Sequence, residues 1–138
     1  MSAKRGVVYW DSTALLSALF RDEHSEAAVS CAREPGAHIV SSLAWAESHA
    51  VIARLERERA LACVLADAAR EALDLGPWRR VNLAPDRRSL AELARRWPLR
   101  GADLWHLALA VRLRADLPEL EVLTFDSKLS AAARGEGM

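Results

Sequence analysis

Four carboxylates, each in a different segment of the chain, are the side chains best suited to act together as a chemical site: Asp11, Glu47, Asp103 and Asp126. Asp11 follows the apolar run VVYW and Asp126 follows VLTF, so each stands where a short strand is expected to end. Glu47 projects from a largely apolar helix face, where an unpaired charge is costly. Asp103 opens the apolar segment ADLWHLALAVRL, so we expect the first turn of that helix to point into the protein.

Oxygen ligands without His or Cys form the donor set that Mg²⁺ or Mn²⁺ prefers. An ion bound by such acids makes its bound water a nucleophile and neutralises charge on a phosphoryl group during in-line displacement. Carboxylates gathered closely repel one another, so we expect the metal-free cluster to be unstable or partly protonated. The combination therefore points to metal-assisted hydrolysis of a phosphate ester.

Each acid also has a structural explanation when it is taken alone. Asp11, Asp103 and Asp126 stand where aspartate commonly caps a helix and favours its macrodipole. Glu47 has no such role, although an ion pair with Arg54 or another arginine would satisfy it. The chemical interpretation is favoured by the combination, because all four acids can meet at one edge of a sheet.

The elements that must position these acids alternate along the chain. Short β-branched and aromatic runs predict strands at residues 7–10, 38–42, 79–84 and 121–125. Helical periodicity and Pro or Gly stop signals predict helices at residues 25–34, 43–57, 60–75, 85–96 and 128–134. They also predict a first helix that ends near residue 20 and another that begins after Gly101. This order predicts an α/β fold with a parallel sheet covered on both faces. The carboxyl ends of its strands share one edge, where ligands usually bind.

Composition bounds the class of protein. A chain of 138 residues predicts one domain, residues 1–138. With 19 basic and 19 acidic residues the net charge is zero, so any surface that binds nucleic acid must be local. The two cysteines suit neither a zinc knuckle nor a disulfide framework. No stretch is long enough to span a membrane, so we expect no membrane partner and a cytoplasmic location.

Four segments, VVYWDSTALL, SSLAWAESHAVIARL, LRGADLWHLALAVRL and VLTFDSKLSAAARGEGM, resemble in that order the four acidic motifs of PIN-domain ribonucleases. The nearest subset is the VapC-like toxins of toxin–antitoxin pairs. The resemblance implies a PIN-like α/β/α sandwich and a Mg²⁺- or Mn²⁺-dependent endoribonuclease. It assigns the catalytic and metal-binding roles to Asp11, Glu47, Asp103 and Asp126, of which Asp126 would act through water.

The resemblance also implies supporting residues and partners. Ser12, directly after the first acid, would help to position the site, and Arg100 could reach a phosphate of the RNA substrate. His106 fits the family pattern, although packing is its simplest role. The implied partners are a second copy of the chain and a small antitoxin whose tail covers the acids with an arginine.

Two other functions are open at this point. A PIN-like fold could serve only as a protein-binding scaffold, which the loss of an acid would favour, and none of the four is missing. An aspartate-based phosphotransfer domain also places acids at strand ends. The dehalogenase-type site needs an acid where Thr13 stands, however, and receiver domains need an early acidic pair that this chain lacks. We therefore expect the ribonuclease first, the scaffold second and phosphotransfer third.

Overall fold

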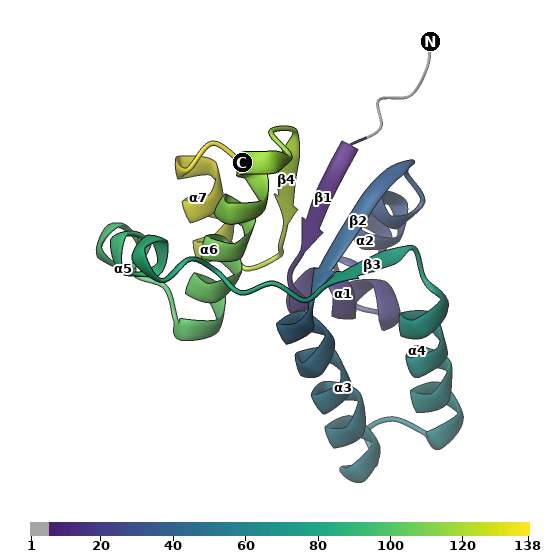
Figure 1. Ribbon diagram of the computed structural model, residues 1–138. Helices are drawn as coiled ribbons and strands as arrows, with labels where there is room; N and C mark the ends of the chain where they lie inside the picture. The colour runs from purple at the N-terminus through teal and green to yellow at the C-terminus, as the bar shows by residue number, and fades with distance from the viewer. Residues whose placement is uncertain (1–5) are drawn as a thin grey trace.

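Four parallel strands form the centre of the protein in a computed structural model that describes residues 6–138. The first five residues of the expected domain lie outside this described part. The strands follow the order β3-β2-β1-β4 and are bounded as β1 Gly6–Trp10, β2 Gly36–Ser41, β3 Trp78–Val81 and β4 Leu120–Leu123. All of them are parallel, so their carboxyl ends lie together at one edge of the sheet, the lower edge in Figure 1.

Within residues 6–138, seven helices connect the strands or follow them: α1 Ser12–Leu19, α2 Ser25–Ala32, α3 Ser42–Arg57, α4 Cys63–Leu75, α5 Arg87–Arg96, α6 Gly101–Asp116 and α7 Ser127–Gly135. They form the outer layers of the expected α/β/α sandwich, which confirms the predicted fold class. Helix α6 covers one face of the sheet, with α5 and α7 packed against it. Helices α1, α2 and α4 and the start of α3 cover the other face.

Alternation along β1 explains this arrangement. Val7 and Tyr9 point toward α6, whereas Val8 and Trp10 point toward α1 and α2, because successive side chains of a strand face opposite sides. Trp10 and Tyr9 are fully buried, so β1 is covered on both faces, as an inner strand of a parallel sheet should be. Tyr9 thereby brings its hydroxyl to α6, where the site is built.

The polar residue at each of three strand–helix junctions caps the helix that follows. Asp11, Ser41 and Asp126 accept hydrogen bonds from the backbone at the starts of α1, α3 and α7. Such caps satisfy backbone N–H groups that have no partner inside the helix. They also fix each capping side chain at the carboxyl edge of the sheet.

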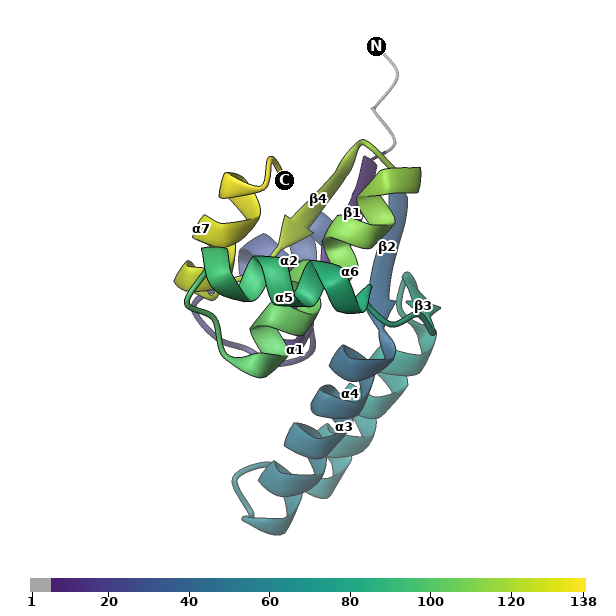
Figure 2. The same ribbon diagram turned by 60° about the vertical axis from the view of Figure 1, so that its left-hand side comes forward.

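A departure of three residues from the predicted boundaries lies between α3 and α4. We expected the fourth helix to begin at residue 60, but it begins at Cys63. Arg59 adopts a positive φ of 55°, and the backbone N–H groups of Ala60 and Leu61 turn back to the carbonyl of Leu55. This turn closes the carboxyl end of α3, after which the two helices form the hairpin that extends below the sheet in Figure 2.

Residues 6–138 contain no helix that combines the length and the apolar character needed to cross a membrane.

Candidate active site

Asp11 is both a helix cap and a buried acid. It lies at the carboxyl end of β1 and is 1% exposed. Its Oδ1 accepts hydrogen bonds from the Ala14 backbone N–H, at 2.9 Å, and from the Thr13 hydroxyl, at 2.7 Å. Its Oδ2 accepts a hydrogen bond from the Thr124 hydroxyl at 2.5 Å. Three donors therefore hold one carboxylate in a single orientation.

The burial of Asp11 exceeds what capping requires. Burial raises the pKa of this carboxyl above its ordinary value, although the hydrogen bonds from Thr124, Ala14 and Thr13 oppose the rise. A cap on an exposed helix end carries no such desolvation cost. Asp11 is therefore an electrostatically costly cap, and such groups concentrate at functional sites.

Asp103 lies near Asp11 and Asp126 although the three acids come from different segments. It stands in the first turn of α6 and is half-buried. Burial raises its pKa, and the negative charges of Asp126 and Asp11 raise it further. Arg100, at the start of α6, acts in the opposite direction. The expected repulsion among strand-end and helix-start acids is thus present at this edge.

Asp126 caps α7 through its Oδ1, which accepts a hydrogen bond from the Leu129 N–H at 2.9 Å. Its own backbone N–H donates to the Thr124 hydroxyl at 3.1 Å. Because the same hydroxyl donates to Asp11, Thr124 connects the carboxylate of Asp11 to the backbone of Asp126. The sheet pairs β1 with β4, which brings these two ends together.

Glu47 lies on α3 and pairs with a histidine, and not with Arg54 or another arginine, which was the structural alternative to a metal-binding role. Its Oε1 lies 3.1 Å from Nε2 of His106, and its side chain is 32% exposed. The other ring nitrogen of His106, Nδ1, lies 2.6 Å from the hydroxyl of Tyr9. Burial raises the pKa of this phenol well above its ordinary value, so it stays protonated. A carboxylate can only accept, so Nε2 of His106 carries the proton that points to Glu47.

The two expected supporting residues have different placements. Ser12 is the first residue of α1, but the hydroxyls that bond Asp11 belong to Thr13 and Thr124. Arg100 is exposed and precedes α6 directly, close enough to affect the pKa of Asp103. Its charge therefore acts on at least one of the four acids.

Sequence analysis missed Tyr9, Thr13 and Thr124 as parts of this site. The two threonines had a signal, because each is a hydroxyl residue two positions away from a strand-end acid. Tyr9 had none, since an aromatic residue in a buried strand is indistinguishable from core. The residue on α6 that we assigned to packing, His106, is packed as expected and is also bonded to an acid.

The donor chemistry of the acids fits a hard divalent cation, but their spacing does not enclose one. Among residues 6–138, no three His, Cys, Asp or Glu side chains lie together in a way that could hold an ion by themselves. Magnesium commonly keeps several waters and takes only one or two carboxylates from a protein. The acids at this edge therefore fit a partly hydrated ion and not a closed cage.

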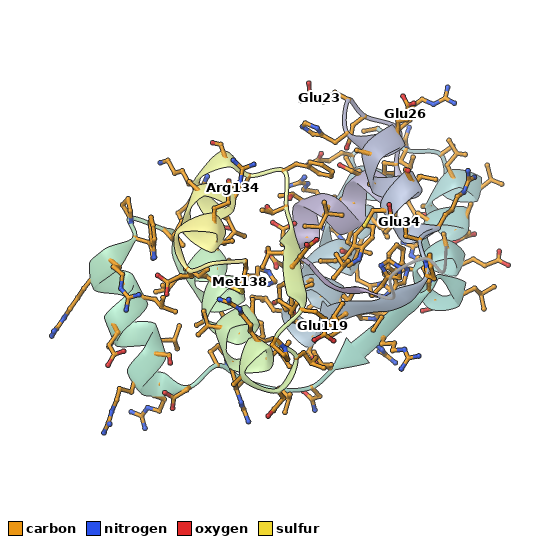
Figure 3. The ribbon with its side chains drawn as sticks, turned by 90° about the horizontal axis from the view of Figure 1, so that it is seen from above. Glu23, Glu26, Glu34, Glu119, Arg134 and Met138 are labelled. Carbon is orange, nitrogen blue, oxygen red and sulfur yellow. The ribbon has the colours of Figure 1, made fainter. Side chains whose placement is uncertain are left out.

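The larger hollows of the surface lie away from these acids. A cavity of about 770 Å³ lies between the end of α1 and α2. Another, of about 520 Å³, opens at the amino-terminal edge of the sheet, where Figure 3 shows Glu34, Glu119 and Met138. Neither of these two cavities is lined by any of the four acids.

Comparison with known proteins gives one result. Curated proteins gave no match to the chain. The family model described as the PIN domain matches residues 8–135, which include all four acids and the hydroxyls that bond them. PIN domains are generally nucleases, and the strand order and the acids at the carboxyl edge agree with that chemistry. The chain therefore belongs to the PIN domain family.

Proposed function

We propose that this protein is a Mg²⁺- or Mn²⁺-dependent endoribonuclease that hydrolyses phosphodiester bonds of cellular RNA. The observation that carries the proposal is the mutual proximity of Asp11, Asp103 and Asp126, through which the pKa of Asp103 is raised by its acidic neighbours. A fold keeps such repulsion at low cost only if a cation relieves it.

Asp11, Glu47, Asp103 and Asp126 would hold a hydrated ion, with one or two carboxylates bound to it directly and the others through water. A divalent ion supplies a Lewis acid for phosphoryl oxygens and a more acidic water at neutral pH. Asp11 contributes a fixed carboxylate, because three donors restrain it. Glu47 is restrained by His106 and remains partly exposed, so it can orient a water toward the phosphate.

Arg100 is the cation best placed to bind a substrate phosphate. Its guanidinium acts on the pKa of Asp103 and lies on the exposed side of the site. Because the chain has no net charge, RNA must be held by local cations of this kind. Arg100→Ala should weaken RNA binding and reduce its salt dependence by about one phosphate contact.

The decisive experiment measures RNA cleavage and metal binding separately. Purified protein should cleave single-stranded RNA with Mg²⁺ or Mn²⁺, lose cleavage in excess EDTA and leave a DNA of the same sequence intact. Either ion should also raise the melting temperature of the wild type, and the rise should be much smaller for Asp103→Asn. Cleavage that persists in chelator overturns the metal mechanism. A metal-induced rise in melting temperature without cleavage favours the scaffold alternative.

We further propose that the protein is a homodimeric toxin of a toxin–antitoxin pair, as the sequence resemblance implies. Concentrated negative charge at the site is a suitable target for a guanidinium, so the antitoxin tail would place an arginine among the acids. Expression of the protein alone should slow growth, and co-expression with a small neighbouring gene should relieve it. Light scattering of the purified protein tests the dimer. Normal growth at confirmed soluble expression would contradict the toxin assignment.

A further inference from the structure

His24 and Phe125 form a stacked aromatic pair beside the acids. Their ring centroids lie 4.3 Å apart and their planes differ by only 4°. His24 stands directly before α2 and Phe125 directly after Thr124, so the stack joins the α1–α2 connection to the β4–α7 connection. The nucleolytic chemistry of the acids uses neither ring.

The position of Phe125 is tied to the acids through the backbone. It lies between Thr124, whose hydroxyl bonds Asp11, and Asp126, which caps α7. Its own N–H donates to the Thr13 hydroxyl at 3.1 Å, and that hydroxyl donates to Asp11. The backbone that carries Phe125 therefore belongs to the same hydrogen-bonded unit as the carboxylate of Asp11.

The turn that carries His24 is held by four hydrogen bonds. The backbone N–H of His24 donates to Asp22 at 2.8 Å, and the Ser17 hydroxyl donates to the same carboxylate at 2.8 Å. The Ser25 hydroxyl accepts from the Asp22 N–H at 2.7 Å and donates to the Phe20 carbonyl at 2.6 Å. The imidazole is thus positioned before any substrate arrives.

The His24 side chain remains partly exposed. It is 42% exposed although Phe125 stacks against its ring. The Oε1 of Glu23 lies 3.4 Å from Nε2 of His24, and Figure 3 shows Glu23 at the outer rim of the α1–α2 connection. Glu23 therefore lies against a ring nitrogen.

We propose that His24, supported by Phe125, is a stacking subsite for one unpaired base of the RNA substrate. The inference rests on the proposed ribonuclease function and narrows its substrate class to single-stranded or looped RNA. Aromatic faces bind unpaired bases with little dependence on base identity, and duplex RNA offers no free face to stack. If the pair served only to pack the two connections together, the exposed part of the His24 side chain would have no role in binding RNA.

The test measures base stacking without cleavage. Full-length Asp103→Asn protein in EDTA is titrated into single-stranded RNAs that carry 2-aminopurine at one position each. Stacking quenches this base, so one position should lose fluorescence on binding. His24→Leu in the same background should restore that fluorescence and weaken binding about tenfold. His24→Tyr should keep the fluorescence quench and the affinity of the parent protein. His49→Leu is the matched control, because His49 lies against Trp45 at 58° and is not stacked.

Two results separate this inference from the proposed function. If no position is quenched more by the parent protein than by His24→Leu, the stacking subsite is wrong, whatever the wild type cleaves. If the wild type fails to cleave RNA with metal but the quench depends on His24, the protein binds RNA through this subsite and the nuclease proposal fails. Melting curves of His24→Leu and His24→Tyr check that both variants are folded. If folded His24→Tyr loses the quench as His24→Leu does, that result also contradicts stacking.

Discussion

Glu47 and His106 are joined by a 3.1 Å contact between Oε1 and Nε2, and Tyr9 fixes the opposite nitrogen of the same ring at 2.6 Å. These two contacts connect three segments of the protein: α3, α6 and β1. His106 is 2% exposed, so its ring cannot turn freely. The buried ring therefore restrains the Glu47 side chain from the interior of the protein. We regard His106 as a positioning residue, because the Glu47 side chain is 32% exposed whereas the ring behind it is buried.

This relationship predicts how removal of the ring affects cleavage. His106→Leu should lower kcat/KM for RNA by about 10- to 100-fold, because groups that orient ligands typically contribute that much. Tyr9→Phe should have a smaller effect in the same direction, since the ring remains but loses its partner at Nδ1. The double variant with Glu47→Gln distinguishes positioning from packing. If His106 acts through Glu47, the two losses are not additive; additive losses would contradict the role.

Asp11 and Asp86 provide a matched pair of helix caps. Asp86 is exposed and accepts a hydrogen bond from the Ser89 N–H at 3.1 Å, whereas Asp11 is buried and accepts three. Asparagine caps about as well as aspartate, so Asp86→Asn and Asp11→Asn should both leave the fold intact. We predict that only Asp11→Asn lowers RNA cleavage, by orders of magnitude, because it removes charge without removing the cap. Circular dichroism and cleavage rates check the pair, and equal rates for both variants would make Asp11 a cap only.

The common edge of Asp11 and Asp126 could be predicted from the sequence, because the carboxyl ends of parallel strands lie at the same edge of a sheet. Asp11 and Asp126 were expected at one edge since parallel strands share it, and the register of β1 with β4 places them there. Side-chain partners obey no comparable rule. The pairing of Glu47 with His106 depends on how α3 and α6 approach each other across the sheet, and helix periodicity gives only the face of each helix.

Thr124 illustrates the same limit at shorter range. It was expected inside a strand at residues 121–125, but β4 ends at Leu123, so its side chain is free to bond Asp11. A boundary error of two residues therefore hid a direct partner of the site. Boundaries depend on hydrogen bonds between strands that are distant in sequence, which local patterns do not determine.

The Thr124 hydroxyl predicts a change in the pH dependence of cleavage. It donates to Asp11 and so stabilises the charged carboxylate against the rise in pKa that burial causes. Thr124→Val keeps the shape and removes the donor, so the pKa of Asp11 should rise and the acidic limb of the kcat/KM profile should move to higher pH. Thr124→Ser keeps the donor and should leave the limb in place. The profiles are measured at fixed, saturating magnesium, and coincident limbs for the valine variant and the wild type would contradict this role.

The raised pKa of Asp103 predicts the stability of the metal-free protein. A carboxyl whose pKa is higher in the folded state binds its proton more tightly there, so stability falls as pH rises from the unfolded value, about 3.9, through the folded value. Below about pH 4 the group is protonated in both states and contributes nothing.

Asp103→Asn removes this penalty, and the sign of its effect follows. In EDTA, the variant should melt at a higher temperature than the wild type at pH 7, and the difference should shrink as the pH falls toward about 4. Added magnesium should reduce or reverse the difference, since the wild type gains a ligand that the variant has lost. Asp86→Asn, at an exposed cap outside the cluster, should show no comparable gain. A metal-free difference that is negative, or that does not change with pH, would show that Asp103 bears no repulsion from Asp11 and Asp126.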